Sequence, residues 1–115
     1  MTLGIDTLNQ IESLARLYHI GYRSVMIEAT IPKLVMIERT QMEREVASLE
    51  DHLHSFEEQY NLSSEEFYKR FRAGEMGDDA DWFDWSAFYQ MWLSTRQRLQ
   101  TLDQNCPHPS SYPRR

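Results

Sequence analysis

The stretch Asn61–Trp92, NLSSEEFYKRFRAGEMGDDADWFDWSAFYQMW, decides the fold of this chain. It reads as a short capped helix, an acidic turn with two glycines, and a second helix crowded with aromatic side chains. Ser63 and Glu66, three residues apart, form a capping box, in which each side chain satisfies a free backbone N–H at the start of a helix. The pattern predicts a helix over about 63–73.

The turn after this helix carries its own signals. Gly74 can adopt the positive φ that ends a helix, and Gly77 marks a second turn. Asp81 is then expected to cap a helix over about 82–102. The residues predicted to shape this helix–turn–helix motif are Ser63, Glu66, Phe67, Phe71, Gly74, Gly77, Asp78 and Asp81.

The second helix holds more aromatic residues than one narrow stripe can take. Six of the eleven residues from Trp82 to Trp92 are aromatic, and positions on a helix are 100° apart. Core packing can use part of this surface, which leaves Phe83, Phe88 and Met91 on its flanks. Because Trp, Tyr and Met are enriched where proteins bind one another, we predict a partner-binding surface. Its residues are Trp82, Phe83, Trp85, Phe88, Tyr89, Met91 and Trp92.

A long helix is predicted before this stretch, over about 32–60. Apolar side chains recur there in steps of four and three, as in a heptad seam, and only Arg39 interrupts the register. The helix would be about 43 Å long, and therefore needs a partner. It either folds back on the two later helices, which costs no association entropy, or pairs with another chain. The seam comprises Val35, Met42, Val46, Leu49, Leu53, Phe56 and Tyr60.

The N-terminal part is less decisive. Apolar residues at helical spacing predict a helix from Asp6 to about His19, and Gly21 breaks it. Residues 22–31 are rich in β-branched side chains, so a strand hairpin competes with a short helix or turn. We favour the helix or turn, followed by the long helix with Pro32 in its first turn.

Together these signals predict an all-α fold. A single domain over 1–102 would contain the long helix in a hairpin or small bundle with the shorter C-terminal helices. Residues 103–115 include three prolines and few apolar side chains, and are predicted to be a disordered tail. The chain's single cysteine, Cys106, lies in this tail, so no internal disulfide can form.

Charge narrows the choice of partner. The net charge is −6 and the isoelectric point is near 5.1, which opposes binding to nucleic acid or to anionic membranes. An acidic protein suits a basic protein partner. The start of the chain lacks a charged signal region, and no apolar run is long enough to span a membrane, so we expect a cytoplasmic protein.

Chemical sites are not indicated. The acidic residues between Glu75 and Asp84 have the wrong spacing for a calcium loop, and helix capping explains them more simply. His52 and His54 are two positions apart on a helix and point away from each other, so they cannot share a metal. Motifs for nucleophiles and phosphate binding are missing. We therefore expect no enzyme activity, no metal and no cofactor.

The segment Phe56–Trp92 resembles a family of small helical prokaryotic proteins, found in cyanobacteria and archaea, with the motif SSxxFYxRFxxGELGDxxDxxEW. Met76 and Asp84 depart from this motif, which more often has leucine and glutamate there. The matching residues are Ser63, Ser64, Phe67, Tyr68, Arg70, Phe71, Gly74, Glu75, Gly77, Asp78, Asp81 and Trp85.

The resemblance implies an antitoxin of a toxin–antitoxin pair, which neutralises its partner toxin by direct binding. It identifies no catalytic residue. The alternative is a homo-oligomeric coiled-coil protein without a toxin partner, in which the heptad seam pairs with itself.

Overall fold

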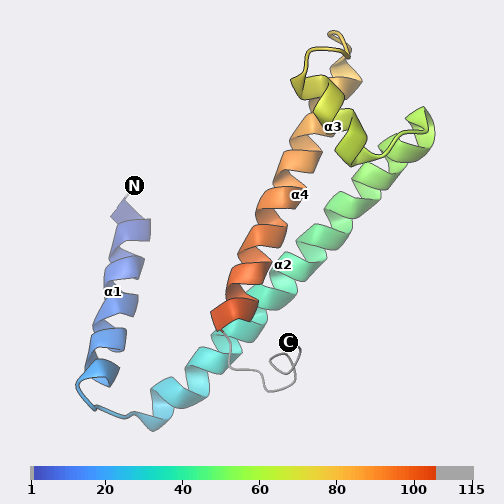
Figure 1. Ribbon diagram of the computed structural model, residues 1–115. Helices are drawn as coiled ribbons and strands as arrows, with labels where there is room; N and C mark the ends of the chain where they lie inside the picture. The colour runs from blue at the N-terminus through green and yellow to red at the C-terminus, as the bar shows by residue number, and fades with distance from the viewer. Residues whose placement is uncertain (1, 106–115) are drawn as a thin grey trace. The chain divides into compact units, whose positions relative to one another are not determined.

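The computed structural model describes residues 2–105 as four helices, without strands in that range (Figure 1). They are α1 (Thr2–His19), α2 (Val25–Tyr60), α3 (Ser64–Arg72) and α4 (Ala80–Asn105). The prediction of an all-α fold is confirmed. Internal contacts divide the chain into an N-terminal unit, residues 1–36, and a C-terminal unit, residues 37–115. The prediction of one domain over 1–102 stays a prediction.

The long helix begins earlier than its sequence suggested. Ser24 caps α2, because its Oγ accepts a hydrogen bond from the Ile27 N–H at 3.2 Å and its carbonyl accepts one from the Glu28 N–H at 3.0 Å. Pro32 therefore lies inside the helix rather than in its first turn, and contributes no N–H to the helical ladder. The β-branched residues after Ser24 are helical, and the strand alternative is wrong for them.

The N-terminal unit contains α1 and the first turns of α2. α1 begins at Thr2 rather than at Asp6, and Gly21, with φ of 98°, turns the chain after it. Tyr18 Oη donates to Glu28 Oε2 at 2.9 Å, and Arg23 Nε donates to the same oxygen at 2.6 Å. These hydrogen bonds, from Arg23 first and Tyr18 second, lower the pKa of Glu28 to about 2.

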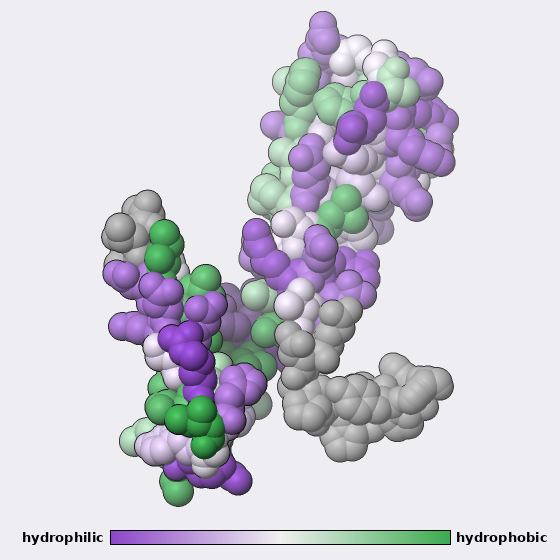
Figure 2. All heavy atoms as spheres, turned by 60° about the vertical axis from the view of Figure 1, so that its left-hand side comes forward, coloured by the Kyte–Doolittle hydropathy of each residue, from purple (hydrophilic) through white to green (hydrophobic). Residues whose placement is uncertain are grey.

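Apolar side chains of the N-terminal unit remain exposed. Among residues 4–36 no side chain is buried, and twelve large apolar residues are 38–88% exposed. Hydrophobic surface accordingly shows over α1 in Figure 2. We call these residues the N-terminal apolar set: Ile5, Leu8, Ile11, Leu14, Leu17, Ile20, Tyr22, Val25, Met26, Ile31, Leu34 and Met36.

The C-terminal unit is built around the heptad seam. Here α2 and α4 run side by side, and α3 lies at the end where α2 stops and α4 begins (Figure 1). Leu49 and Leu53 of the seam are buried, so the prediction that the long helix folds back on the C-terminal helices is confirmed. Arg39 interrupts the seam because it forms an ion pair with Asp103 of α4.

The caps of α3 and α4 differ in two respects from the sequence prediction. Glu66 does not return the capping bond in the described contacts, because its Oε2 accepts from Arg70 Nε at 3.1 Å. Ser63 Oγ accepts from the Glu66 N–H at 3.1 Å, and Gly74 and Gly77 have φ of 77° and 86°, as predicted. However, Asp79 rather than Asp81 caps α4, because its Oδ1 accepts from the Asp81 N–H at 2.9 Å.

The Asp81 carboxylate has another role. It accepts a hydrogen bond from Tyr60 Oη. This bond joins the end of α2 to the first turn of α4. This hydrogen bond, with burial as a second cause, raises the pKa of Tyr60 to about 12. Asp81 therefore remains a structural residue of the motif, although it does not cap the helix.

The C-terminal end of α4 also departs from the prediction. The helix continues to Asn105, three residues beyond its predicted end at about residue 102. Residues 103–105 extend the helical pattern, and Asp103 is held by its ion pair with Arg39. Cys106 and the rest of the predicted tail lie outside the described residues.

Candidate functional site

Trp85, one of the residues predicted to bind a partner, is the centre of the core. Its side chain is 0% exposed. The indole stacks on Phe67 with ring centroids 4.0 Å apart and planes within 1°, and on Phe56 at 5.4 Å. Its Nε1 donates to Ser64 Oγ at 2.9 Å. Trp85 is therefore unavailable to a partner, because α2 and α3 cover it.

The other predicted partner-binding residues spread around α4. Phe83 and Met91 are 54% and 46% exposed, and Phe83 meets Phe71 edge-on at 5.6 Å. Phe88 stacks on His52 of α2 at 4.3 Å. The remaining three, Trp82, Tyr89 and Trp92, are half-buried against the core. The structure therefore does not bring all seven residues into one surface.

Tyr89 and Trp92 come together in a groove where α2, α3 and α4 meet. The groove has a volume of about 350 Å³. Apart from these two rings and Leu53, its lining is polar and largely acidic. The lining residues are Glu50, Leu53, His54, Glu57, Ser63, Ser64, Glu65, Tyr89 and Trp92, and we call it the acidic–aromatic groove.

Hydrogen bonds fix two of its three carboxylates. Glu50 Oε2 accepts from Trp92 Nε1 at 3.0 Å, which orients the indole. Glu57 Oε2 accepts from the Ser64 N–H at 2.9 Å, at the start of α3. The third carboxylate, Glu65, is exposed on α3. Each helix thus supplies a separate part of the lining.

Charged side chains of both signs lie near the two rings. Burial raises the pKa of Tyr89, and the nearby Glu65 carboxylate raises it further because it disfavours a second negative charge. The Arg96 guanidinium lies over the Trp92 ring, 4.9 Å from its centroid. Trp92 therefore makes a cation–π contact with Arg96 of the same chain.

The sequence reasoning missed Glu50, Glu57 and Glu65. Glu50 and Glu57 are seven residues apart, so they flank the heptad seam on one side, and this spacing could have identified them. Glu65 comes from another helix, and its proximity to them follows only from the tertiary structure. Nothing in the sequence pattern singles it out.

Other kinds of site find little support in the part of the chain that the structure describes. Over residues 2–105, three acidic or histidine side chains never converge closely enough to hold a metal ion. Within the same range, every helix is too short or too polar to cross a membrane.

No known protein family, characterised protein or solved structure matches this chain significantly. The resemblance to the antitoxin-like family therefore rests on the motif residues between Ser63 and Trp85 alone.

Proposed function

We propose that this protein is an antitoxin-like binding module that acts in the cytoplasm and neutralises a basic partner protein by holding it at the acidic–aromatic groove. The observation that carries the proposal is the groove itself, which three carboxylates line together with the rings of Tyr89 and Trp92. The motif between Ser63 and Trp85 supports a toxin as the partner. Binding of this kind requires no catalytic residue.

Recognition would depend on a lysine or arginine side chain of the partner. The exposed carboxylates of Glu50 and Glu65 can accept charge-assisted hydrogen bonds from it, which are about twice as strong as neutral ones. The aromatic rings can add a cation–π contact, as Arg96 already makes with Trp92. Arginine fits best, because its planar guanidinium both stacks on rings and pairs with carboxylates.

The charge of the surrounding unit would assist the encounter. Residues 37–115 hold fifteen acidic and nine basic side chains, a net charge of −6, so the whole charge of the protein resides there. Such a field steers a basic partner toward the groove and raises the association rate at low salt. We expect the association rate to fall steeply with ionic strength.

Co-expression tests the proposal for a toxin partner. The chain is produced together with the product of the adjacent gene, and the two are separated by size-exclusion chromatography at low and at physiological salt. Co-elution at a defined stoichiometry is expected. Separate elution at both salt concentrations would reject the adjacent gene product as the partner.

Charge-neutral variants test the groove. The double variant Glu50→Gln, Glu65→Gln removes two groove carboxylates, and should weaken the complex about tenfold for each charge-assisted hydrogen bond that it removes. The matched control is Glu43→Gln, Asp51→Asn, which removes the same charge from exposed positions of α2 outside the groove. Equal affinity of the two variants would show that net charge, and not the groove, determines binding.

A further inference from the structure

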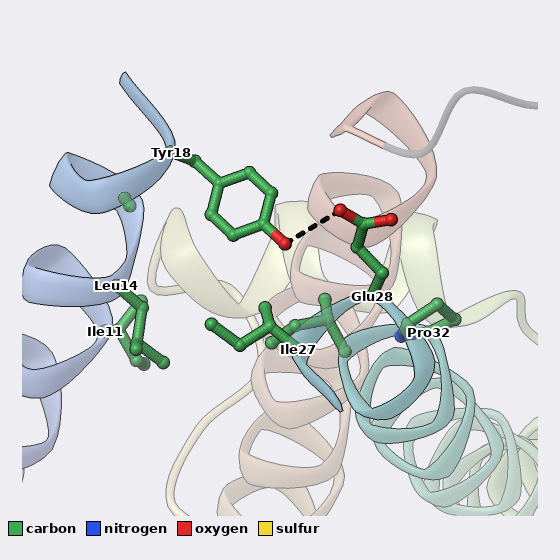
Figure 3. Close-up of a pocket in the computed structure, with 8 residues that line it drawn as sticks. Ile11, Leu14, Tyr18, Ile27, Glu28 and Pro32 are labelled. Carbon is green, nitrogen blue, oxygen red and sulfur yellow. Dashed lines mark hydrogen bonds between the residues drawn. The ribbon is translucent and has the colours of Figure 1, made fainter. Parts of the chain in front are cut away.

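The N-terminal unit exposes apolar surface from two helices that face each other without closing. Ile11 and Leu14 of α1 point toward Ile27 of α2 (Figure 3). All three line a cavity of about 440 Å³, which Ile31 of α2 lines as well. Ile11 and Ile31 are still 58% and 43% exposed. A helical pair becomes stable when its apolar faces are covered by another layer. This pair lacks that layer in its own unit.

The first turns of α2 are apolar on more than one side. Ile27 and Ile31 line the cavity, whereas Val25 and Met26 do not line it and are among the most exposed apolar residues of the unit. Apolar side chains on more than one side of a helix need cover on each of those sides. More than one additional helix is needed to bury both the cavity side of α2 and the side that carries Val25 and Met26.

The exposed apolar area reaches, at the upper end of its range, what a stable dimer needs. The twelve residues of the N-terminal apolar set are exposed by about 58% on average, which is equivalent to about seven complete side chains. Burial of one complete apolar side chain removes roughly 60–120 Å² of apolar surface from water. The exposed apolar surface of the set is therefore roughly 400–850 Å² per chain. A stable interface of standard size buries about 800 Å² per partner.

Charge favours a second copy over other occupants. Residues 1–36 carry three acidic and three basic side chains, a net charge of zero, so two copies do not repel each other there. A basic partner would be drawn to the acidic C-terminal unit instead. A membrane-binding helix pair would need a polar face rich in lysine and arginine, but Arg23 is paired with Glu28 and only Arg16 and Lys33 remain.

We propose that a second copy of this chain docks on the N-terminal apolar set, so that α1 and residues 25–36 of both copies form a two-fold symmetric four-helix arrangement. In such an interface the same patch lies on both sides, and Ile11 and Ile31 of one copy meet the corresponding cavity of the other. The two helices of the second copy supply the cover that both sides of α2 require. This interface shares no residue with the acidic–aromatic groove.

Light scattering and sedimentation equilibrium of the full chain over a wide dilution series test this inference. The double variant Ile11→Gln, Ile31→Gln makes the cavity polar at positions that are 58% and 43% exposed in the single chain. The control, Phe83→Gln, Met91→Gln, changes apolar residues of α4 with similar exposure, 54% and 46%. We expect a dimer for the original chain and the control, and an increase of the dimer dissociation constant by about a hundredfold or more for the cavity variant.

Three results would overturn the inference. A chain that is monomeric at every concentration has no such interface, and a cavity variant that dimerises like the control uses another surface. A monomer that binds vesicles of anionic lipid through Ile11 and Ile31 would assign the apolar set to a membrane. The groove variants Glu50→Gln and Glu65→Gln should dimerise normally. If they fail to co-elute with the basic partner, that result concerns the groove and not the dimer interface.

Discussion

The two units of this chain are both helical, but only the C-terminal unit closes a core of its own. Phe67 and Trp85 are fully buried there between α2, α3 and α4, whereas among residues 4–36 every side chain keeps part of its surface in water. Caps and local hydrogen bonds are present in both units. Caps and local hydrogen bonds favour helix formation in both units. Burial of the apolar faces against other helices supplies most of the stability.

The two units also differ in net charge. All of the net charge of −6 belongs to residues 37–115, and residues 1–36 are neutral. The acidic unit suits a basic partner, and the neutral apolar unit suits a second copy. We therefore expect the two interactions to be independent of each other.

The largest effect should come from removing the central indole. Trp85→Ala deletes a fully buried side chain that stacks on Phe67 and Phe56, and should lower the free energy of unfolding by about 3–5 kcal/mol. Ile11→Ala in the N-terminal unit should cost less than about 1 kcal/mol in dilute solution, because that side chain is already mostly exposed. Urea denaturation followed by circular dichroism measures both. Similar losses would contradict the difference between the units.

A smaller effect is expected from a pair of serines. Ser64→Ala leaves the buried Trp85 Nε1 without its acceptor, and should cost about 1–3 kcal/mol. Ser13 of α1 donates to the Asn9 carbonyl at 3.0 Å on an exposed helix surface, so Ser13→Ala should change the stability by about 0.5 kcal/mol or less. The same denaturation experiment compares them. An equal cost would mean that the buried hydrogen bond is worth no more than the exposed one.

Two glycines should respond with opposite signs. Gly74 has φ of 77°, so Gly74→Ala places a side chain in the left-handed region and should destabilise the C-terminal unit by about 1–2 kcal/mol. Gly4 lies within α1 with open space around it, and Gly4→Ala should stabilise the helix by about 0.5–1 kcal/mol. Melting curves provide the comparison. A stabilising Gly74→Ala would show that the turn after α3 does not need its glycine.

The smallest effects should appear at the two ends of the pH range. The lowered pKa of Glu28, about 2, means that its hydrogen bonds with Arg23 and Tyr18 stabilise the N-terminal unit above the ordinary carboxyl value of 4.5, and that this stabilisation disappears as the pH falls toward 2. The raised pKa of Tyr60, about 12, means that its hydrogen bond to Asp81 stabilises the C-terminal unit below pH 10, and that this stabilisation disappears as the pH rises through 12.

NMR titration of the Glu28 carboxyl and of the Tyr60 ring follows both groups. In Asp81→Asn, the pKa of Tyr60 should move back toward 10, because the charged acceptor is gone. Retention of a pKa near 12 in this variant would assign the shift to burial instead. Likewise, Arg23→Gln should raise the pKa of Glu28, and an unchanged pKa would contradict the assigned cause.

Local signals in the sequence were sufficient for much of the C-terminal fold. The serine cap of α3, the turn glycines and the heptad seam each depend on neighbouring residues or on helical spacing, and all are present in the structure. The start of α2 was predicted at about residue 32 instead of Val25, because β-branched residues after Ser24 fit strands as well as helices. The missed signal was Ser24 itself, directly before an apolar run.

The candidate site could be predicted only in part. Tyr89 and Trp92 were among the residues predicted to bind a partner, and both line the groove, but the local pattern did not show that α2 and α3 cover Trp85. The groove also depends on Glu50 and Glu65, which come from different helices. Contacts between elements that are distant in the sequence are not contained in any local pattern.

Hydrogen exchange of the backbone amides at several protein concentrations tests the central claim most directly. If the C-terminal unit closes its own core and the N-terminal unit requires a second copy, protection around Leu49–Leu53 and Phe67 should be independent of concentration. Protection in residues 8–19 and 25–36 should rise as the dimer forms. Strong protection of the N-terminal unit in samples dilute enough to be monomeric would contradict the account.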